Sequence, residues 1–247
     1  ILNKNITRIL YNNFASAVVA LSNGVKEDLT ENFSINKEKI SVIYNPIEVE
    51  KIKDMSSEKI EDLEFAGEQK VIVSVGRLVE QKNFPLLFNA FKKVKESIDC
   101  KLVIVGKGHL EQSLKNLSEE LGVFDDVIFL GFKENPYKYM KMADVFVLSS
   151  KWEGFGHVIV EAMATGTPVI STDCKSGPSE IIEDNKYGVL VPVENPRILA
   201  EKMVELLNND SLREKYIELG YERAQHFKAS EITKEYEKIF DEIILSK

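Results

Sequence analysis

Residues 144–161 read Asp144-Val145-Phe146-Val147-Leu148-Ser149-Ser150-Lys151-Trp152-Glu153-Gly154-Phe155-Gly156-His157-Val158-Ile159-Val160-Glu161. The first five predict a buried strand, and the Gly-X-Gly bend that follows opens a helix. Backbone NH groups at a helix N-terminus favour a phosphate or another anion. Glu153 precedes the bend and Glu161 lies eight positions later in the helix, so both carboxylates could reach sugar or ribose hydroxyls. We therefore expect a site for a sugar joined to a phosphate.

Strands and helices alternate around this stretch, which indicates a parallel, doubly wound α/β sheet of the Rossmann-like kind. Ligands of such sheets bind beyond the carboxyl ends of the strands. The apolar runs predict strands at 71–75, 102–105, 127–130, 144–148, 168–171 and 188–191. Helices are expected between these strands and, after the last strand, at 196–208, 211–225 and 231–245.

The composition divides the chain into four parts. Residues 1–46 carry two short strands around a helix, and the charged segment 47–69 reads as a linker with one short helix. Residues 70–229 form the main domain, and 230–247 form a last helix with an apolar stripe. That stripe packs either on the main domain or back on residues 1–46.

The bulk numbers exclude several classes of protein. Of the 247 residues, 44% are hydrophobic and 29% charged, as in a soluble globular protein, and the net charge of −8 disfavours a nucleic-acid surface. Cys100 and Cys174 offer neither a disulfide framework nor metal spacing, which favours the cytoplasm. No apolar run reaches the roughly 20 residues of a membrane span. A peripheral contact with the inner face of a membrane stays open.

Cations and glycines follow two other predicted strands. Arg77 and Lys82 lie in the loop after the strand at 71–75 and are suited to a diphosphate leaving group, whose charge grows as its bond to the sugar breaks. The alternative is a surface loop with two solvated charges. Gly106-Lys107-Gly108 allows close approach to a ligand, or forms an ordinary turn between strand and helix.

The acids of the opening stretch also allow two interpretations. Glu161 either binds a ribose or complements the helix dipole. Glu153 either is an exposed loop acid, or holds a sugar hydroxyl and stabilises an oxocarbenium-like centre. The three histidines are His109, His157 and His226, which are too scattered to predict a metal site.

Taken together, these motifs resemble retaining glycosyltransferases of family 4, the glycosyl transferases group 1. The resemblance covers about residues 15–225. Its most specific part is the pair of glutamates in the opening stretch. The matching elements are Gly76-Arg77-Leu78, Gln81-Lys82-Asn83, Gly106-Lys107-Gly108, Leu130-Gly131-Phe132, 143–149, 153–156, 161–170 and 178–182.

The resemblance implies a GT-B fold, in which two Rossmann-like domains face each other across a cleft. The C-terminal domain would bind the nucleotide-sugar donor. The N-terminal acceptor domain would be mostly absent here, with 1–46 as its remnant. We therefore expect the chain alone to be inactive, and the acceptor, a glycan or a lipid-linked sugar, to bind through the missing domain.

The family also implies residue roles. Arg77 and Lys82 would hold the diphosphate and, with Glu153, form the catalytic set, while Glu161 would hold the ribose. Transfer would retain the anomeric configuration, with the leaving phosphate taking part and neither metal nor cofactor required. The remaining expected donor-binding residues are Gly76, Gly106, Gly108, Phe132, Gly154, Phe155, Gly156, His157 and Val158.

The resulting hypothesis is the donor-binding part of a transferase. It would move a hexose or N-acetylhexosamine, UDP-linked, to a glycan or lipid-linked acceptor during assembly of surface polysaccharide or lipopolysaccharide. The alternatives are a non-catalytic donor-binding subunit of a split transferase, a sugar-nucleotide epimerase of the same fold, and a plain nucleotide-binding domain.

Overall fold

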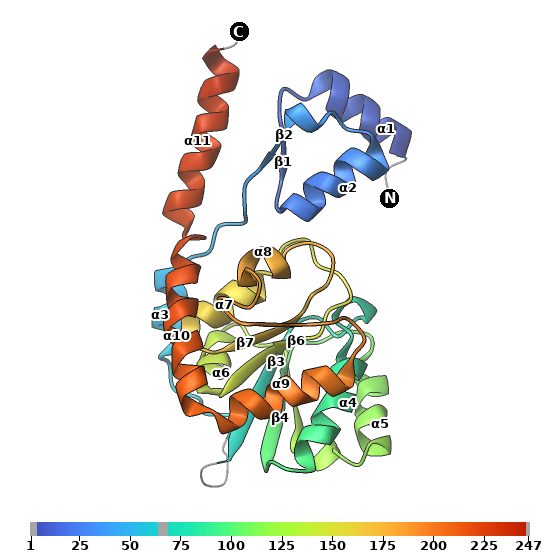
Figure 1. Ribbon diagram of the computed structural model, residues 1–247, viewed down its shortest axis with the longest axis vertical. Coiled ribbons are helices and arrows are strands. Elements are labelled where there is room, and N and C mark those ends of the chain that lie inside the picture. The colour runs from blue at the N-terminus through green and yellow to red at the C-terminus, as the bar shows by residue number, and fades with distance from the viewer. Residues whose placement is uncertain (1–3, 64–68, 246–247) are drawn as a thin grey trace.

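The computed structural model describes residues 4–63 and 69–245, which form a large lobe, a small lobe and a long last helix (Figure 1). The large lobe is built on a six-stranded sheet in which every strand pair is parallel. The strand order is β5-β4-β3-β6-β7-β8. The strands are β3 (Lys70–Val75), β4 (Cys100–Val105), β5 (Val127–Gly131), β6 (Val145–Leu148), β7 (Val169–Thr172) and β8 (Val189–Val191).

Helices cover both faces of this sheet, which confirms the predicted doubly wound α/β fold (Figure 1). The central strands β6 and β7 are buried along their whole length, as their unbroken apolar runs require. The helices are α4 (Phe84–Lys95), α5 (Glu111–Glu120), α6 (Tyr137–Met142), α7 (His157–Thr165), α8 (Pro178–Ile182), α9 (Pro196–Asn208) and α10 (Asp210–Gln225).

Two apolar clusters lie on opposite faces of the sheet. Along β3, Ile72 belongs to the cluster under α4 and α9, whereas Val71 and Val73 belong to the cluster under α6 and α7. Successive strand residues point to opposite faces, so one continuous apolar strand supplies both clusters. The order of strands reverses between β3 and β6, and the loops after these two strands open the crevice in which such sheets bind ligands.

The small lobe contains two parallel strands, β1 (Val18–Ala20) and β2 (Ile40–Val42), with α2 (Asn23–Phe33) between them in the chain. Before β1 come α1 (Lys4–Ile9) and the π-helical segment η1 (Leu10–Phe14), and the turn η2 (Lys37–Lys39) precedes β2. A small core of Val18, Ala20, Ile35 and Ile40 holds the lobe together.

The segment 47–69 contains the expected short helix, α3 (Val49–Ser56), but this helix is not a free connector. Val49 and Ile52 are buried in the cluster that α6 and α7 also contact. These two apolar residues, together with the hydrogen bond from the Asn135 side chain to the carbonyl of Met55, attach α3 to the large lobe. Residues 64–68 of the predicted linker lie outside the described residues.

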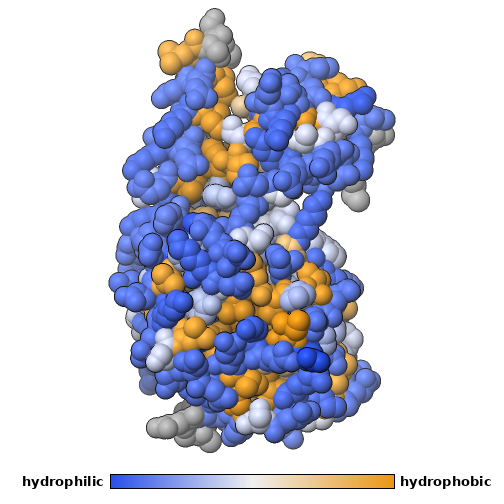
Figure 2. Space-filling view, viewed as in Figure 1, coloured by the Kyte–Doolittle hydropathy of each residue, from blue (hydrophilic) through white to orange (hydrophobic). Residues whose placement is uncertain are grey.

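The last helix, α11 (Ala229–Leu245), starts where the chain also crosses between the lobes. The amide of Ala229 donates to the carbonyl of Ile47, and the amide of Ile47 donates to the carbonyl of Phe227. From there α11 extends beyond the large lobe to the height of the small one (Figure 1), and a band of apolar residues follows its length (Figure 2). Ile232 is buried, but Phe240 is 58% exposed, so neither predicted packing partner covers the whole stripe.

Candidate functional site

Two of the predicted catalytic residues meet at the reversal point of the sheet. Lys82 ends the short turn η3 (Glu80–Lys82) after β3, and Glu153 lies in the loop after β6. The Lys82 ammonium nitrogen lies 2.5 Å from Oε1 of Glu153, and the two side chains are only 12% and 8% exposed. The alternative of solvated loop charges therefore fails for both residues.

Further polar contacts fix the carboxylate of Glu153. The hydroxyl of Ser150 donates to Oε1 over 2.6 Å, and the amide nitrogen of Gln81 lies 3.5 Å from Oε2. The carbonyl of Ser150 in turn accepts from the Thr172 hydroxyl at 2.6 Å. Because Ser150 is fully buried, its hydroxyl holds one orientation of the acid.

The loops after β3 and β6 are also joined through their backbones. The Lys151 amide donates to the carbonyl of Gln81 at 2.8 Å, and the Ser149 hydroxyl donates to the carbonyl of Lys82 at 2.7 Å. Gln81 also donates from its side chain to the carbonyl of Trp152 at 2.9 Å. The Lys82–Glu153 pair thus rests on a rigid frame rather than on two free loops.

The glycine bend turns the chain from Glu153 into α7. Gly156 has a φ of 96°, a left-handed conformation that favours glycine, and no side chain caps the helix it precedes. The Phe155 ring is buried, and its centre lies 5.6 Å from that of Tyr44 and 5.3 Å from that of Phe227. Only the backbone of Phe155 is therefore able to face a ligand at the start of α7.

The next two residues are less enclosed. The His157 side chain reaches the surface, but nearby protein atoms shield its ring from water and lower the pKa of His157. Val158 is partly buried against the cluster under α6 and α7. The backbone NH groups of this first turn remain the part of the bend suited to an anion.

Glu161 lies one helical turn beyond His157. The hydroxyl of Tyr137 on α6 lies 3.5 Å from its Oε1. Burial raises the pKa of Glu161, although the hydrogen bond from Tyr137 and the charge of Lys82 oppose this shift. Glu161, Tyr137 and His157 line one hollow of about 320 Å³, beside Pro46 and the start of α3.

Arg77 lies apart from the Lys82–Glu153 pair. Its side chain is exposed, and no hydrogen bond or ion pair joins its guanidinium to another described residue. It lines a mostly apolar hollow of about 420 Å³ together with Gly76, Lys107 and Phe132. The Lys107 ammonium lies 5.6 Å from the centre of the Phe132 ring, which is 62% exposed.

Close approach of backbones explains two predicted binding glycines. A Cβ atom on Gly106 would lie 1.9 Å from the carbonyl oxygen of Gly76, and one on Gly108 would lie 2.3 Å from that of Leu78. Neighbouring protein therefore already requires glycine at both positions. On Gly76 a Cβ would come within 3.3 Å of the Lys82 chain, so this glycine leaves room for the lysine.

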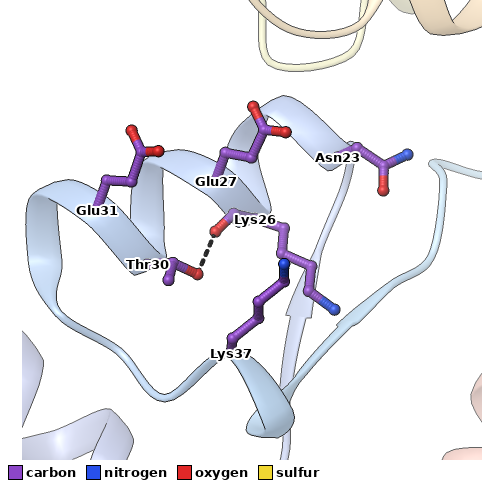
Figure 3. Close-up of a pocket in the computed structure, with 6 residues that line it drawn as sticks. All are labelled: Asn23, Lys26, Glu27, Thr30, Glu31 and Lys37. Atoms are coloured by element: carbon purple, nitrogen blue, oxygen red, sulfur yellow. Dashed lines mark hydrogen bonds between the residues drawn. The ribbon is translucent and has the colours of Figure 1, made fainter.

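Another hollow, of about 250 Å³, lies on the small lobe and contains none of the predicted site residues (Figure 3). Glu27 and Glu31 point away from Lys26 and Lys37, so its charges are mixed (Figure 3). The Lys26 ammonium donates to the carbonyl of Ile40 and supports β2. This hollow offers no concentrated charge to a ligand.

Within residues 4–63 and 69–245, no cluster of three or more His, Cys, Asp or Glu side chains is placed to hold a metal ion. No helix in the same residues combines the length and the apolar character needed to cross a bilayer.

Three residues support the site without a predicted role: Gln81, which belongs to the matching element 81–83, Ser150 and Tyr137. Gln81 and Ser150 follow strands at the reversal point, and this position is a signal for both. Tyr137 reaches Glu161 from a different helix, α6, which no local pattern indicates.

Residues 55–223 match the family model described as glycosyl transferases group 1. The chain is 37% identical over 235 residues to the N-acetylgalactosamine-N,N'-diacetylbacillosaminyl-diphospho-undecaprenol 4-alpha-N-acetylgalactosaminyltransferase of Campylobacter jejuni, an alignment covering 95% of this chain and 62% of that protein. It spans 52% to 64% of the length of three curated relatives.

Solved structures agree with this match. A glycosyltransferase from Rickettsia africae superposes with a TM-score of 0.85 at 25% identity, over 97% of this chain and 67% of that one. TarM of S. aureus, crystallised with UDP, superposes with a TM-score of 0.81 at 25% identity, over 96% and 46%. The family match covers more than half of the chain, and the sheet and its motifs agree with it. The chain therefore belongs to the glycosyl transferases group 1 family and has a fold of the GT-B type.

Proposed function

We infer that the large lobe binds the nucleotide-sugar donor of a retaining glycosyltransferase. The donor is a UDP-linked hexose or N-acetylhexosamine, and the acceptor is a glycan or lipid-linked sugar of a surface polysaccharide. Two names support this choice: the Campylobacter relative is an N-acetylgalactosaminyltransferase named for an undecaprenol-linked substrate, and TarM was crystallised with UDP.

The observation that carries the proposal is the contact between Lys82 and Glu153 beside the uncapped start of α7. Both charges sit at the reversal point of the sheet, where a ligand of this fold binds. A diphosphate placed there receives hydrogen bonds from the lysine and from the first NH groups of α7. It competes for the lysine, which leaves the carboxylate of Glu153 available to the donor sugar.

This arrangement fits the charges that develop during transfer. Negative charge grows on the leaving diphosphate, where Lys82 and the exposed Arg77 stabilise it more in the transition state than in the ground state. Positive charge grows at the anomeric carbon, which the carboxylate of Glu153 stabilises. The leaving phosphate takes part in transfer to the same face of the sugar, and the protein cations replace a metal ion.

The ribose and the base of the nucleotide bind in two different hollows, which the remaining site residues line. Glu161 accepts hydrogen bonds from the ribose hydroxyls, with Tyr137 holding its carboxylate. The apolar hollow lined by Phe132, Gly76 and Gly106 receives the base. Arg77 and Lys107 line the same hollow, and we assign their positive charges to the phosphates.

Calorimetry with a nucleotide panel tests the proposal. UDP, GDP, ADP and the UDP-linked forms of glucose, galactose, N-acetylglucosamine and N-acetylgalactosamine are titrated into the chain, with Mg²⁺ and with EDTA. We expect UDP and at least one UDP-sugar to bind with equal affinity in both buffers. Binding of no nucleotide contradicts the donor role, and a strict need for Mg²⁺ contradicts the metal-free mechanism. Epimerised UDP-sugar after incubation would favour the epimerase.

A further inference from the structure

A small hollow lies between the two lobes, next to Glu153. Its volume is about 210 Å³, below the roughly 300 Å³ at which ordinary ligand pockets begin, so it has room for a single ring rather than a nucleotide. One wall belongs to α2 of the small lobe and the others to the loops after β6 and β7. The lining residues are Val25, Asp28, Trp152, Glu153, Lys175 and Ser176.

Trp152 is the single tryptophan of the chain and is 51% exposed. Its backbone is fixed, because its carbonyl accepts from Gln81 and because it forms a parallel bridge with Lys175. Its indole ring stacks on no aromatic ring or cation of the described residues. A large aromatic side chain thus extends from a fixed backbone beside Glu153, and no ring or cation of the described residues stacks on it.

Two charged side chains near the Trp152 ring are exposed and able to contact a ligand. Lys175 and Asp28 form an ion pair of 3.4 Å across the lobes, with side chains 61% and 43% exposed. A pair so exposed contributes little to stability, and a ligand is able to replace it. The hollow therefore combines an apolar platform with a carboxylate acceptor and an ammonium donor on its rim. Sugars need this combination, because they present an apolar face and a ring of hydroxyls.

We propose that this hollow binds one saccharide ring of the acceptor, with Trp152 as its platform and Asp28 and Lys175 as its polar contacts. This inference rests on the proposed transferase function. The residues assigned to base and ribose line other hollows, and of the predicted donor residues only Glu153 reaches this one. A ring between α2 and Glu153 contacts both lobes.

Tryptophan fluorescence tests the site without any engineered reporter, because the chain's single tryptophan lies within it. The probes are the methyl glycosides of glucose, galactose, N-acetylglucosamine and N-acetylgalactosamine, titrated separately in the absence and presence of saturating UDP. We expect at least one glycoside to change the emission of Trp152 with a saturable dependence, in both conditions. A panel that leaves the emission unchanged overturns the proposal.

Variants then separate the ring contact from folding. By calorimetry, Trp152→Ala is expected to weaken glycoside binding about fivefold, as loss of an aromatic contact does, whereas Trp152→Phe keeps most of it. Phe124→Ala removes an aromatic side chain of similar exposure, 43% against 51%, from η4 (Phe124–Asp126) and is the matched control. Equal glycoside affinities of Trp152→Ala and the wild type overturn the platform role.

The same titrations distinguish this inference from the proposed function. UDP binding without any glycoside effect leaves the donor site standing and removes the acceptor ring. An emission change with UDP-sugars but not with methyl glycosides assigns the hollow to the donor sugar and overturns the acceptor assignment. A chain that binds glycosides but no nucleotide contradicts the proposed function and keeps the saccharide site.

Discussion

The ammonium nitrogen of Lys82 and Oε1 of Glu153 lie 2.5 Å apart, across the point where the strand order of the sheet reverses. Without ligand, the cation and the acid of the proposed mechanism neutralise each other. Both are nearly buried, so neither is able to find a replacement partner in water. A ligand that binds here must offer the lysine an anion.

The first prediction concerns the stability of this pair. Lys82→Met leaves the acid buried without its cation and is expected to reduce the free energy of unfolding by about 3 kcal/mol. The double variant Lys82→Met with Glu153→Gln removes both charges and should lose clearly less. Urea denaturation measures both, with the exposed Lys202→Met as the control. A double variant less stable than Lys82→Met would argue against a mutually dependent pair.

The second prediction concerns pH and Glu161. Burial raises the pKa of this acid, so the fold favours its neutral form, and ionisation costs stability as the pH rises through the raised pKa. Ribose hydroxyls donate to the ionised form, so UDP should bind more tightly as the pH rises above the ordinary glutamate range. Calorimetry of the wild type against Glu161→Gln isolates this effect from titration of UDP itself. Parallel pH profiles for the two proteins would refute the ribose contact.

The third prediction concerns the contact between the lobes. The Glu180 carboxylate accepts from the amides of Asn23 and Gly24 at the start of α2, and from the hydroxyl of Tyr44. Burial would raise the pKa of Glu180, but these hydrogen bonds outweigh it and lower the pKa. The contact therefore stabilises the protein above the ordinary glutamate pKa and is lost as the pH falls through the lowered value.

Glu180→Ala should accordingly speed hydrogen exchange at the amides of Asn23 and Gly24 near neutral pH, by roughly tenfold or more for the loss of a charged hydrogen bond. The rest of α2 should change less. Glu222→Gln, an exposed acid on α10, is the control. Unchanged exchange at both amides would show that Glu180 does not hold the lobes together.

The fourth prediction concerns two reasons for a glycine: a neighbouring atom that leaves no room for a Cβ, and a backbone conformation with positive φ. Gly106→Ala places a Cβ on the carbonyl of Gly76, whereas Gly122→Ala meets nothing within 4 Å, and both residues have positive φ. The Gly122 variant should lose about 1 kcal/mol from its backbone conformation alone. The Gly106 variant should lose clearly more, or fail to accumulate as folded protein. Equal melting temperatures for the Gly106 and Gly122 variants would contradict the close packing of Gly106 against Gly76.

How far the sequence predicts this site depends on the kind of contact. Strand ends and glycine turns place Lys82 and Glu153 at one edge of the sheet, because carboxyl ends of parallel strands share an edge. Their direct contact joins residues 71 positions apart. It forms because packing buries both side chains, so that each is the charged partner of the other. Ser150 orients the carboxylate of Glu153, but its sequence neighbours do not indicate this role. The role depends on the position of the strand before it, β6.

The contacts of other elements cannot be predicted from a local sequence pattern. The helix α3 reads as a charged linker, because its buried apolar residues Val49 and Ile52 are few and their partners lie on α6 and α7. Gly106 and Gly108 read as ligand-facing turns, and the backbone of the neighbouring loop explains them. In both cases the deciding neighbour is distant in the chain.

In the proposed mechanism, Lys82 leaves Glu153 and binds the diphosphate of a nucleotide. Calorimetric titration of UDP into the wild type and into the double variant Lys82→Met with Glu153→Gln measures this binding, because this pair of changes leaves no unpaired buried charge. We predict that UDP binds the wild type and binds the double variant at least about tenfold more weakly, as loss of a charge-assisted hydrogen bond requires. Equal affinities for UDP would contradict the claim.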